Sequence, residues 1–296
     1  MAVKVSIADE TFRQFDRLAL VSRRPARGGT GGEHHSRRPA PSTDFVDYRP
    51  YQPGDDFRRI DWNVYGRLGS LQLKLTEGRE RLDVFVILDC SSSMAYGTPD
   101  KLQYAAQLVA ALAYIGTSRT DAVHIACLAQ PAAAARFGPF SRRARLPELA
   151  RQLSSVAAAG LVDLSLGLSE CIPDGAPSTS LAIVVSDLLS PNGVASGLAT
   201  LQARVADVAV LHLISPEELE PQISGEVELI DAESGAALEL GISLGTLAAY
   251  RARLAAWLDE RAAECRRRGL RYIRVTTDRP LAAVVLDDLR RGGLLK

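Results

Sequence analysis

Two short apolar runs have the pattern of strands that are buried on both faces of a sheet. Residues 84–88 and 181–185 are continuous apolar stretches that include β-branched side chains. Similar stretches follow at residues 122–128, 208–214 and 272–275, with segments of helical periodicity between them. Strands that alternate with helices over about 200 residues indicate a parallel sheet that is covered on both faces. The sequence therefore predicts an α/β fold with a doubly wound, mostly parallel sheet.

The remaining patterns predict the helices and minor strands of this fold. Alternating leucines and polar residues at 71–76 predict a half-buried strand, and residues 132–137 an antiparallel companion of the strand at 122–128. Residues 227–230 and 237–240 flank a Glu-Ser-Gly turn and predict a β-hairpin. Helices are expected at residues 8–21, 100–115, 146–156, 164–171, 195–206, 247–268 and 281–291.

We expect two parts of the chain, with the boundary between residues 80 and 81. Residues 81–296 form the α/β domain, and residues 1–80 form an N-terminal extension with a helix, a basic Gly/Pro/Arg loop and a polar-aromatic segment. The loop at residues 23–38 is interpreted either as a solvated linker or as an anion-binding arm. In residues 44–80, acidic side chains nearly match basic ones in number, and aromatic residues lie among them. We therefore expect an ion-pair network that holds this segment on the main domain, rather than a surface that stacks bases.

Composition excludes several classes of protein. Hydrophobic residues make up 47% and charged residues 24% of the 296 positions, and the formal net charge is zero. This balance gives no overall field that favours nucleic acid or a membrane surface. The four cysteines are far apart in the sequence, which argues against a zinc site or a disulfide framework. With no signal peptide and no apolar run of transmembrane length, we expect a cytoplasmic protein with no membrane span.

Oxygen-bearing side chains follow both of the buried runs. Asp89, Ser91 and Ser93 come directly after the first run, and Asp187 comes after the second. Because open α/β sheets bind ligands at the carboxyl edge of their strands, we expect these side chains to form one site. Oxygen ligands suit Mg²⁺ or Mn²⁺ rather than a soft metal. The alternative is that the serines cap the following helix and Asp89 balances its dipole.

Residues 82–275 resemble a von Willebrand factor A domain, in which the first strand ends in an Asp-x-Ser-x-Ser metal-ion-dependent adhesion motif. The resemblance implies that Ser91 and Ser93 hold a divalent cation directly, and that Asp89 and Asp187 act through water. The separate threonine of the motif aligns with Val162, which has no ligating oxygen. Asp163 is adjacent and is the candidate substitute, although its position also suits the cap of the helix that begins at residue 164.

The segment Y-Q-P-G-D-D-F-R-R-I-D-W-N at residues 51–63 is typical of a narrower bacterial family. By this signature, the whole chain resembles the family called domain of unknown function fifty-eight. Members are commonly encoded beside MoxR-type AAA+ ATPases, so the resemblance implies such an ATPase as a partner in protein assembly or maturation. Many relatives carry N-terminal transmembrane helices, which this chain lacks.

Three hypotheses for function follow. The first is a non-catalytic interaction module whose bound cation accepts an acidic side chain of a partner protein. The second is a metal-free interaction scaffold with a degenerate site, which Val162 favours. The third is a metal-assisted phosphohydrolase that uses Asp89 as nucleophile or ligand.

The sequence lacks the residues that an enzyme of this kind needs. A haloacid-dehalogenase-like phosphatase has a second aspartate two residues after the first, where this chain has Ser91. No glycine-rich phosphate loop with a following lysine, H-E-x-x-H or G-x-S-x-G motif is present. Cys90 comes at a helix start, but His124 and His212 lie inside apolar strands, away from it in sequence. We therefore predict that the chain is not an enzyme and has no catalytic residue.

Overall fold

The chain consists of two compact units, residues 1–28 with 82–296, and residues 29–81. The computed structural model describes residues 3–5, 9–23, 45–52, 55, 57–76, 81–129, 135–173, 175–176, 180–232 and 235–296, of which 45–47, 59 and 74–76 only by their backbone. The junction at residues 81 and 82 lies next to the boundary expected from the sequence. Residues 1–28, however, group with the sheet and not with the segment that follows them.

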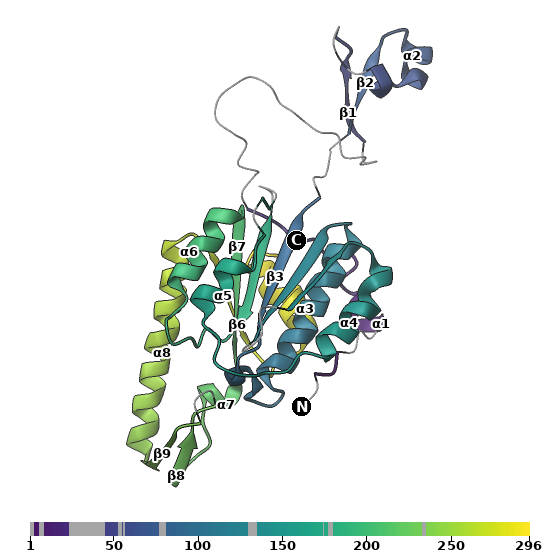
Figure 1. Cartoon of the computed structure of the whole chain (residues 1–296). Helices are drawn as coiled ribbons and strands as arrows, with labels where there is room; N and C mark the ends of the chain where they lie inside the picture. Colours follow the sequence, from purple (N-terminus) through teal and green to yellow (C-terminus); the bar gives the residue numbers. More distant parts are fainter. Residues whose placement is uncertain are drawn as a thin grey trace. The chain divides into compact units, whose positions relative to one another are not determined.

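A six-stranded sheet forms the centre of the larger unit (Figure 1). Its order is β10-β7-β6-β3-β4-β5, and every neighbouring pair is parallel except β4 with β5. The predicted α/β class with a doubly wound, mostly parallel sheet is therefore confirmed. The strands are β3 (Asp83–Asp89), β4 (Ala122–Leu128), β5 (Ala135–Phe140), β6 (Leu181–Ser186), β7 (Asp207–Ile214) and β10 (Arg271–Thr276).

Helices cover both faces of this sheet (Figure 1). Alternate residues of β3 enter different core layers, with Val84, Val86 and Leu88 on one face and Phe85 and Ile87 on the other. This explains the unbroken apolar run, because a strand covered on both faces has no solvent side. The first layer contains α1 (Asp9–Arg13), α3 (Lys101–Ser118), α4 (Leu146–Ser154), α9 (Leu281–Ala283), a π-helical turn (Val284–Asp288) and α10 (Leu289–Arg291), and the second contains α5 (Leu164–Glu170), α6 (Ala195–Arg204) and α8 (Leu244–Arg267).

The N-terminal helix is shorter than its periodicity suggests. The sequence predicts a helix over residues 8–21, whereas α1 ends at Arg13 and turns follow it. Leu20 then forms a β-bridge with Leu295, and the Ala19 N–H donates to the carbonyl oxygen of Lys296 at 3.1 Å. Extended pairing with the C-terminal residues therefore replaces the predicted later turns.

The smaller unit is built on an antiparallel pair, β1 (Phe45–Pro50) and β2 (Gln72–Thr76), with the short helices η1 (Phe57–Arg59) and α2 (Trp62–Leu68) between them. The strand predicted at residues 71–76 is confirmed. Within this unit Arg49 and Asp55 form a two-pronged ion pair, with N–O distances of 2.6 and 2.9 Å. The Asp61 carboxylate caps α2 by accepting from the Asn63 N–H at 2.9 Å. The wider network predicted here includes residues outside the described part of the chain, and its role in holding this unit on the sheet stays a prediction.

The predicted β-hairpin is also confirmed. It comprises β8 (Gly225–Ile230) and β9 (Ala237–Ile242), and it lies between α7 (Pro216–Leu219) and the N-terminal end of α8. Neither strand pairs with the large sheet. Glu228 lies directly opposite Glu239, and Leu229 lies opposite Leu238. One face of the hairpin is therefore acidic and the other apolar.

Strand order determines where this sheet can bind a ligand. Numbered along the chain within the sheet, the six strands have the order 6-5-4-1-2-3. Connections from the two central strands, β3 and β6, leave in opposite directions, which makes their carboxyl ends the switch point of a doubly wound sheet. The carboxyl ends of β3 and β6 are Asp89 and Ser186.

Candidate functional site

The Asp89 carboxylate lies at this switch point. It accepts hydrogen bonds from the loop that follows β3 and from the end of β6. Its Oδ1 accepts from the Ser91 N–H at 2.9 Å, and its Oδ2 accepts from the Ser186 hydroxyl at 2.5 Å. The first bond turns the chain out of β3, and the second joins the ends of β3 and β6. Asp89 is only 1% exposed. Burial raises the pKa of Asp89 to about 6, and the nearby negative charge of Asp187 adds to the effect.

The two serines of the motif face each other. Ser91 Oγ lies 3.0 Å from Ser93 Oγ, and Ser91 is fully buried. Ser91 precedes the short 3₁₀ turn η2 (Ser92–Ala95) but makes no side-chain capping bond there. The cap of the following long helix, α3, is Asp100, whose Oδ1 accepts from the Gln103 N–H at 2.6 Å. The alternative that the serines serve as helix caps is therefore wrong.

The loop that carries Val162 and Asp163 lies beside this turn, because the Ser92 N–H donates to the Gly160 carbonyl oxygen at 2.9 Å. Val162 is buried in the second core layer. Asp163 caps α5, with Oδ1 accepting from the Ser165 N–H at 2.9 Å. Its Oδ2 accepts from the Asn192 side-chain amide at 2.7 Å. Both oxygens of the candidate substitute ligand are thus engaged in local bonds.

Lys101 is the site residue that the sequence analysis missed. Its Nζ lies 2.7 Å from Oδ2 of Asp187, and it also forms an ion pair with Glu218. The Lys101 side chain has no exposed surface, and that of Asp187 is 2% exposed. Burial alone lowers the pKa of Lys101, but the charges of Asp187 and Glu218 outweigh burial and hold the pKa above its ordinary value. The site therefore contains an ammonium group that is charged at neutral pH.

One feature of the sequence could have indicated Lys101. It is the first residue of α3, where the positive end of the helix dipole disfavours a cation. A lysine at such a position needs carboxylates nearby, and these are supplied by Asp187, which directly follows β6, and by Glu218 of α7. Sequence spacing does not reveal this group, because its members lie 86 and 117 residues from Lys101.

The donor set does not fit the divalent cation that the resemblance implies. Ser91 and Ser93 offer neutral hydroxyl oxygens that already contact each other, and Val162 offers none. Oδ2 of Asp187 is held by the Lys101 ammonium, and its Oδ1 accepts from the Leu189 N–H at 3.0 Å. In the part of the chain that the structure describes, no three His, Cys, Asp or Glu side chains gather as a metal site.

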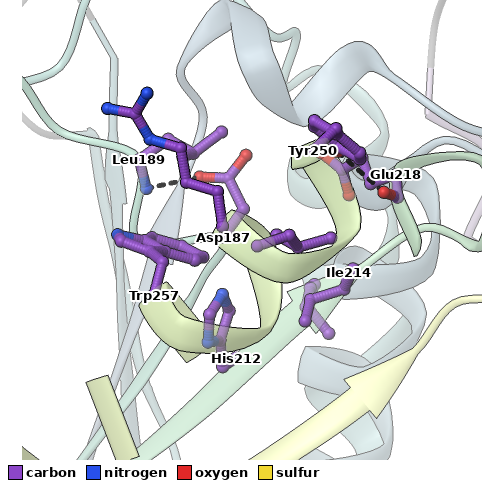
Figure 2. A pocket seen from close by; sticks show the side chains of 10 residues that line it. Asp187, Leu189, His212, Ile214, Glu218, Tyr250 and Trp257 are labelled. Carbon is purple, nitrogen blue, oxygen red and sulfur yellow. Dashed lines mark hydrogen bonds between the residues drawn. The ribbon is translucent and has the colours of Figure 1, made fainter. Parts of the chain in front are cut away.

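A pocket opens next to Asp187, with a volume of about 300 Å³. Figure 2 shows that α8 contributes Tyr250 and Trp257, which lie on either side of the group, and that β7 contributes His212 and Ile214. The Tyr250 hydroxyl donates to the Glu218 carbonyl oxygen at 2.7 Å, which fixes α7 against α8. Leu189, Leu254 and Arg253 complete most of the wall, so apolar side chains predominate.

The titratable groups that a nucleophilic enzyme would use have unsuitable surroundings. Cys90 is fully buried, and its hydrogen bond with Cys127, together with burial, raises the pKa of its thiol. His212 is buried, its Nδ1 lies 2.7 Å from the Tyr272 hydroxyl, and burial lowers its pKa to about 4. His124 stacks on Phe85 at a ring distance of 4.6 Å. Each group is held in the fold by its neighbours.

Comparison with known proteins identifies the family. A family model described as "Protein of unknown function DUF58" matches residues 47–263. The chain belongs to the DUF58 family. This confirms the family expected from residues 51–63. Uncharacterized proteins of Mycobacterium tuberculosis (strain ATCC 25618 / H37Rv) and Mycobacterium bovis are 27% identical to it over 285 residues, which cover 94% of this chain and 89% of each relative.

Several solved structures have partly similar backbones. A conserved hypothetical protein, BatB, from Bacteroides thetaiotaomicron has a TM-score of 0.41 and 14% identity, over 72% of this chain and 98% of its own. An aerotolerance-related membrane protein from Bacteroides fragilis has a TM-score of 0.46 and 16% identity, with the same coverage. Manganese-loaded TRAP from Plasmodium vivax has a TM-score of 0.35 and 14% identity, over 45% of this chain and 57% of its own. In the described part of the DUF58 chain, no helix is long and apolar enough to cross a membrane.

Proposed function

We propose that this DUF58 chain is a non-catalytic protein-interaction module, and that a partner segment docks at the pocket between β7 and α8. The observation that carries the proposal is the pocket beside Asp187, at the carboxyl edge of the sheet. Its wall is mainly apolar, and two of its lining residues, Leu189 and Tyr250, are 43% and 40% exposed. Apolar side chains that stay this exposed at a concave site favour an apolar anchor from a second protein.

A small-molecule ligand fits this pocket less well. Ligand sites combine apolar walls with a few polar groups that orient the bound molecule. The two carboxylates that line this pocket, Asp187 and Glu218, are both paired with the buried Lys101. Arg253 is the cation among the lining residues. The pocket therefore offers contact area and one cationic group at its wall, which suits a leucine or phenylalanine side chain flanked by an acidic residue.

The surroundings of the nucleophilic groups support a non-catalytic role. A thiol must ionise to attack a substrate, and burial with a raised pKa opposes ionisation of Cys90. We expect Cys90 of the folded chain to be inert toward a thiol reagent such as 5,5′-dithiobis(2-nitrobenzoate), and to react once the chain is unfolded. Rapid reaction of one thiol in the folded chain, lost in Cys90→Ala, contradicts this part of the proposal.

The partner class comes from the family resemblance, which associates such chains with MoxR-type AAA+ ATPases. The test is the affinity of the full chain for the MoxR-type ATPase encoded in the same genome, measured by biolayer interferometry. Leu254→Glu places a charge in the apolar wall, and we expect it to weaken binding at least tenfold. Leu244→Glu changes the same residue type on the same helix at a position that is 88% exposed and outside the pocket, so we expect no loss.

If both variants bind the ATPase as tightly as the wild-type chain does, the pocket is not the docking site. Loss of binding in both variants would point to a role of the whole α8 surface instead of the pocket. Far-ultraviolet circular dichroism and thermal unfolding of both variants exclude the trivial explanation that Leu254→Glu unfolds the chain.

A further inference from the structure

We propose that Lys101 is the resident cation of the Asp-x-Ser-x-Ser site, and that its ammonium replaces the divalent ion which this motif implies. The inference goes beyond the proposed docking at the pocket, since it concerns what neutralises the Asp187 carboxylate of the motif. On this proposal, the site keeps its structure without Mg²⁺ or Mn²⁺.

The first argument is the position of the Lys101 ammonium. Nζ lies 2.7 Å from Oδ2 of Asp187, the carboxylate that the motif uses in its outer ligand shell. Glu218 of α7 contacts the same nitrogen from the other side. Oε2 of Glu218 in turn accepts from the Ser215 N–H at 2.7 Å, which fixes the second carboxylate. Two carboxylates from different elements thus converge on one buried positive charge.

The second argument concerns the oxygens that remain. Each Asp89 oxygen already accepts a hydrogen bond, from the Ser91 N–H and from the Ser186 hydroxyl. The Ser91 and Ser93 hydroxyls share one hydrogen bond, with their oxygens 3.0 Å apart. These bonds hold the Asp89 carboxylate and the two serines to one another and to Ser186 without a metal ion. A divalent ion would have to break the Ser91–Ser93 contact and would gain no oxygen from Val162.

The third argument is electrostatic. Burial lowers the local dielectric constant, so repulsion between a divalent ion and an ammonium group is much stronger here than in water. Lys101 cannot turn away toward solvent, because its side chain is completely buried and is held by two partners. Its ammonium is a compact point charge with up to three donors, which suits two carboxylates on different elements. The ammonium and the divalent ion are therefore alternatives at this site.

The experiment measures Mn²⁺ binding to the full chain by isothermal titration calorimetry, with Mg²⁺ as the second ion. The wild-type chain is expected to show no saturable binding. The matched control is Val162→Thr, which restores the missing hydroxyl in nearly the same volume but keeps Lys101, and it is also expected to show none. Lys101→Ala with Val162→Thr removes the ammonium and supplies the oxygen, and it is expected to bind one equivalent of Mn²⁺. Adding Ser91→Ala to this double variant is expected to abolish that binding.

Three results overturn the inference. The first is stoichiometric binding by the wild-type chain that Ser91→Ala removes. The second is binding by Val162→Thr alone, which would make the missing hydroxyl, and not Lys101, the obstacle. The third is a folded Lys101→Ala/Val162→Thr chain that binds no Mn²⁺. If that double variant does not fold, Mn²⁺ binding by the wild-type chain or by Val162→Thr can still overturn the inference. None of these titrations depends on the MoxR-type ATPase, so the inference and the proposed function fail separately.

Discussion

Arg271 of β10 and Asp207 of β7 form a buried ion pair, and the same arginine also holds residues near both ends of the chain. Nη2 of Arg271 lies 2.5 Å from Oδ2 of Asp207, and the two side chains are 1% and 5% exposed. Nη1 of Arg271 donates to the carbonyl oxygens of Val21 and Gly293 at 2.7 and 2.6 Å. A single guanidinium therefore joins the edge strand, the N-terminal residues and the C-terminal residues.

Loss of this guanidinium removes the positive charge paired with the buried Asp207 carboxylate, which keeps, among the described residues, only the Arg23 N–H on its Oδ2. We expect Arg271→Met to lower the free energy of unfolding by about 3–5 kcal/mol, as measured by urea denaturation. The control is Arg291→Ala, which removes an exposed arginine paired with Asp288 and is expected to cost no more than about 1 kcal/mol. Similar losses in both variants would contradict the role assigned to the buried pair.

The ionisation of Asp89 predicts a pH dependence of stability. Its pKa in the folded chain is about 6, above the ordinary value of 3.8, because it is buried and lies near Asp187. Between about pH 4 and pH 6 the folded chain therefore holds a proton that the unfolded chain releases, so the contribution of Asp89 to stability falls as pH rises through this range.

Asp89→Asn removes this contribution, because the amide stays neutral. We expect the variant to gain stability relative to the wild-type chain as pH rises from 4 to 7, by up to about 3 kcal/mol for a shift of this size. The measurement is urea denaturation of both chains at several pH values. Parallel curves across this range would show that Asp89 keeps its ordinary pKa.

Most of the fold and part of the site follow from the sequence. The runs at residues 84–88 and 181–185 predicted the two central strands, because strands covered on both faces must be apolar throughout. The same runs placed Asp89 and Asp187 at one edge of the sheet. Lys101 was not predicted as a site residue, because its partners, Asp187 and Glu218, are distant in the sequence and only the folded chain brings them together. The N-terminal helix was predicted too long, since periodicity does not record that Leu20 pairs with Leu295.

Helix contacts in the second layer predict the effect of a glycine substitution. A Cβ added at Gly197 of α6 would lie 2.8 Å from the carbonyl oxygen of Leu164 and 3.0 Å from Cβ of Leu168, both in α5. Alanine favours a helix by up to about 1 kcal/mol over glycine. A methyl group forced this close to the backbone of the neighbouring helix, however, overpacks the contact and costs about 1–3 kcal/mol. We therefore expect Gly197→Ala to lower the melting temperature.

A glycine with free space around it serves as the control for this substitution. At Gly245 in the first turn of α8, an added Cβ would meet only Ser243 Oγ at 3.6 Å, an ordinary contact. Gly245→Ala should therefore leave the melting temperature unchanged or raise it slightly. A gain in both variants would mean that α5 and α6 move apart at little cost.

The hairpin of β8 and β9 carries a like-charge pair that weakens it. Glu228 and Glu239 lie directly opposite each other on its acidic face. A two-stranded hairpin is only marginally stable in water, so a cross-strand repulsion has a measurable effect on its local opening. On the other face Leu229 and Leu238 are 42% and 59% exposed, so burial of this pair gives the hairpin limited support.

Glu239→Lys converts the repulsion into an attraction, and we expect it to stabilise the hairpin locally by about 0.5–1 kcal/mol. Amide hydrogen exchange across β8 and β9 is the suitable measurement, because a local gain need not change global unfolding. The control is Glu226→Lys, which makes the same change of charge opposite Gly241, where no carboxylate faces it. Slower exchange in Glu239→Lys than in Glu226→Lys, with a difference that shrinks at high salt, supports the cross-strand pair. Equal slowing in both variants would instead attribute the gain to the reduced negative charge of the hairpin as a whole.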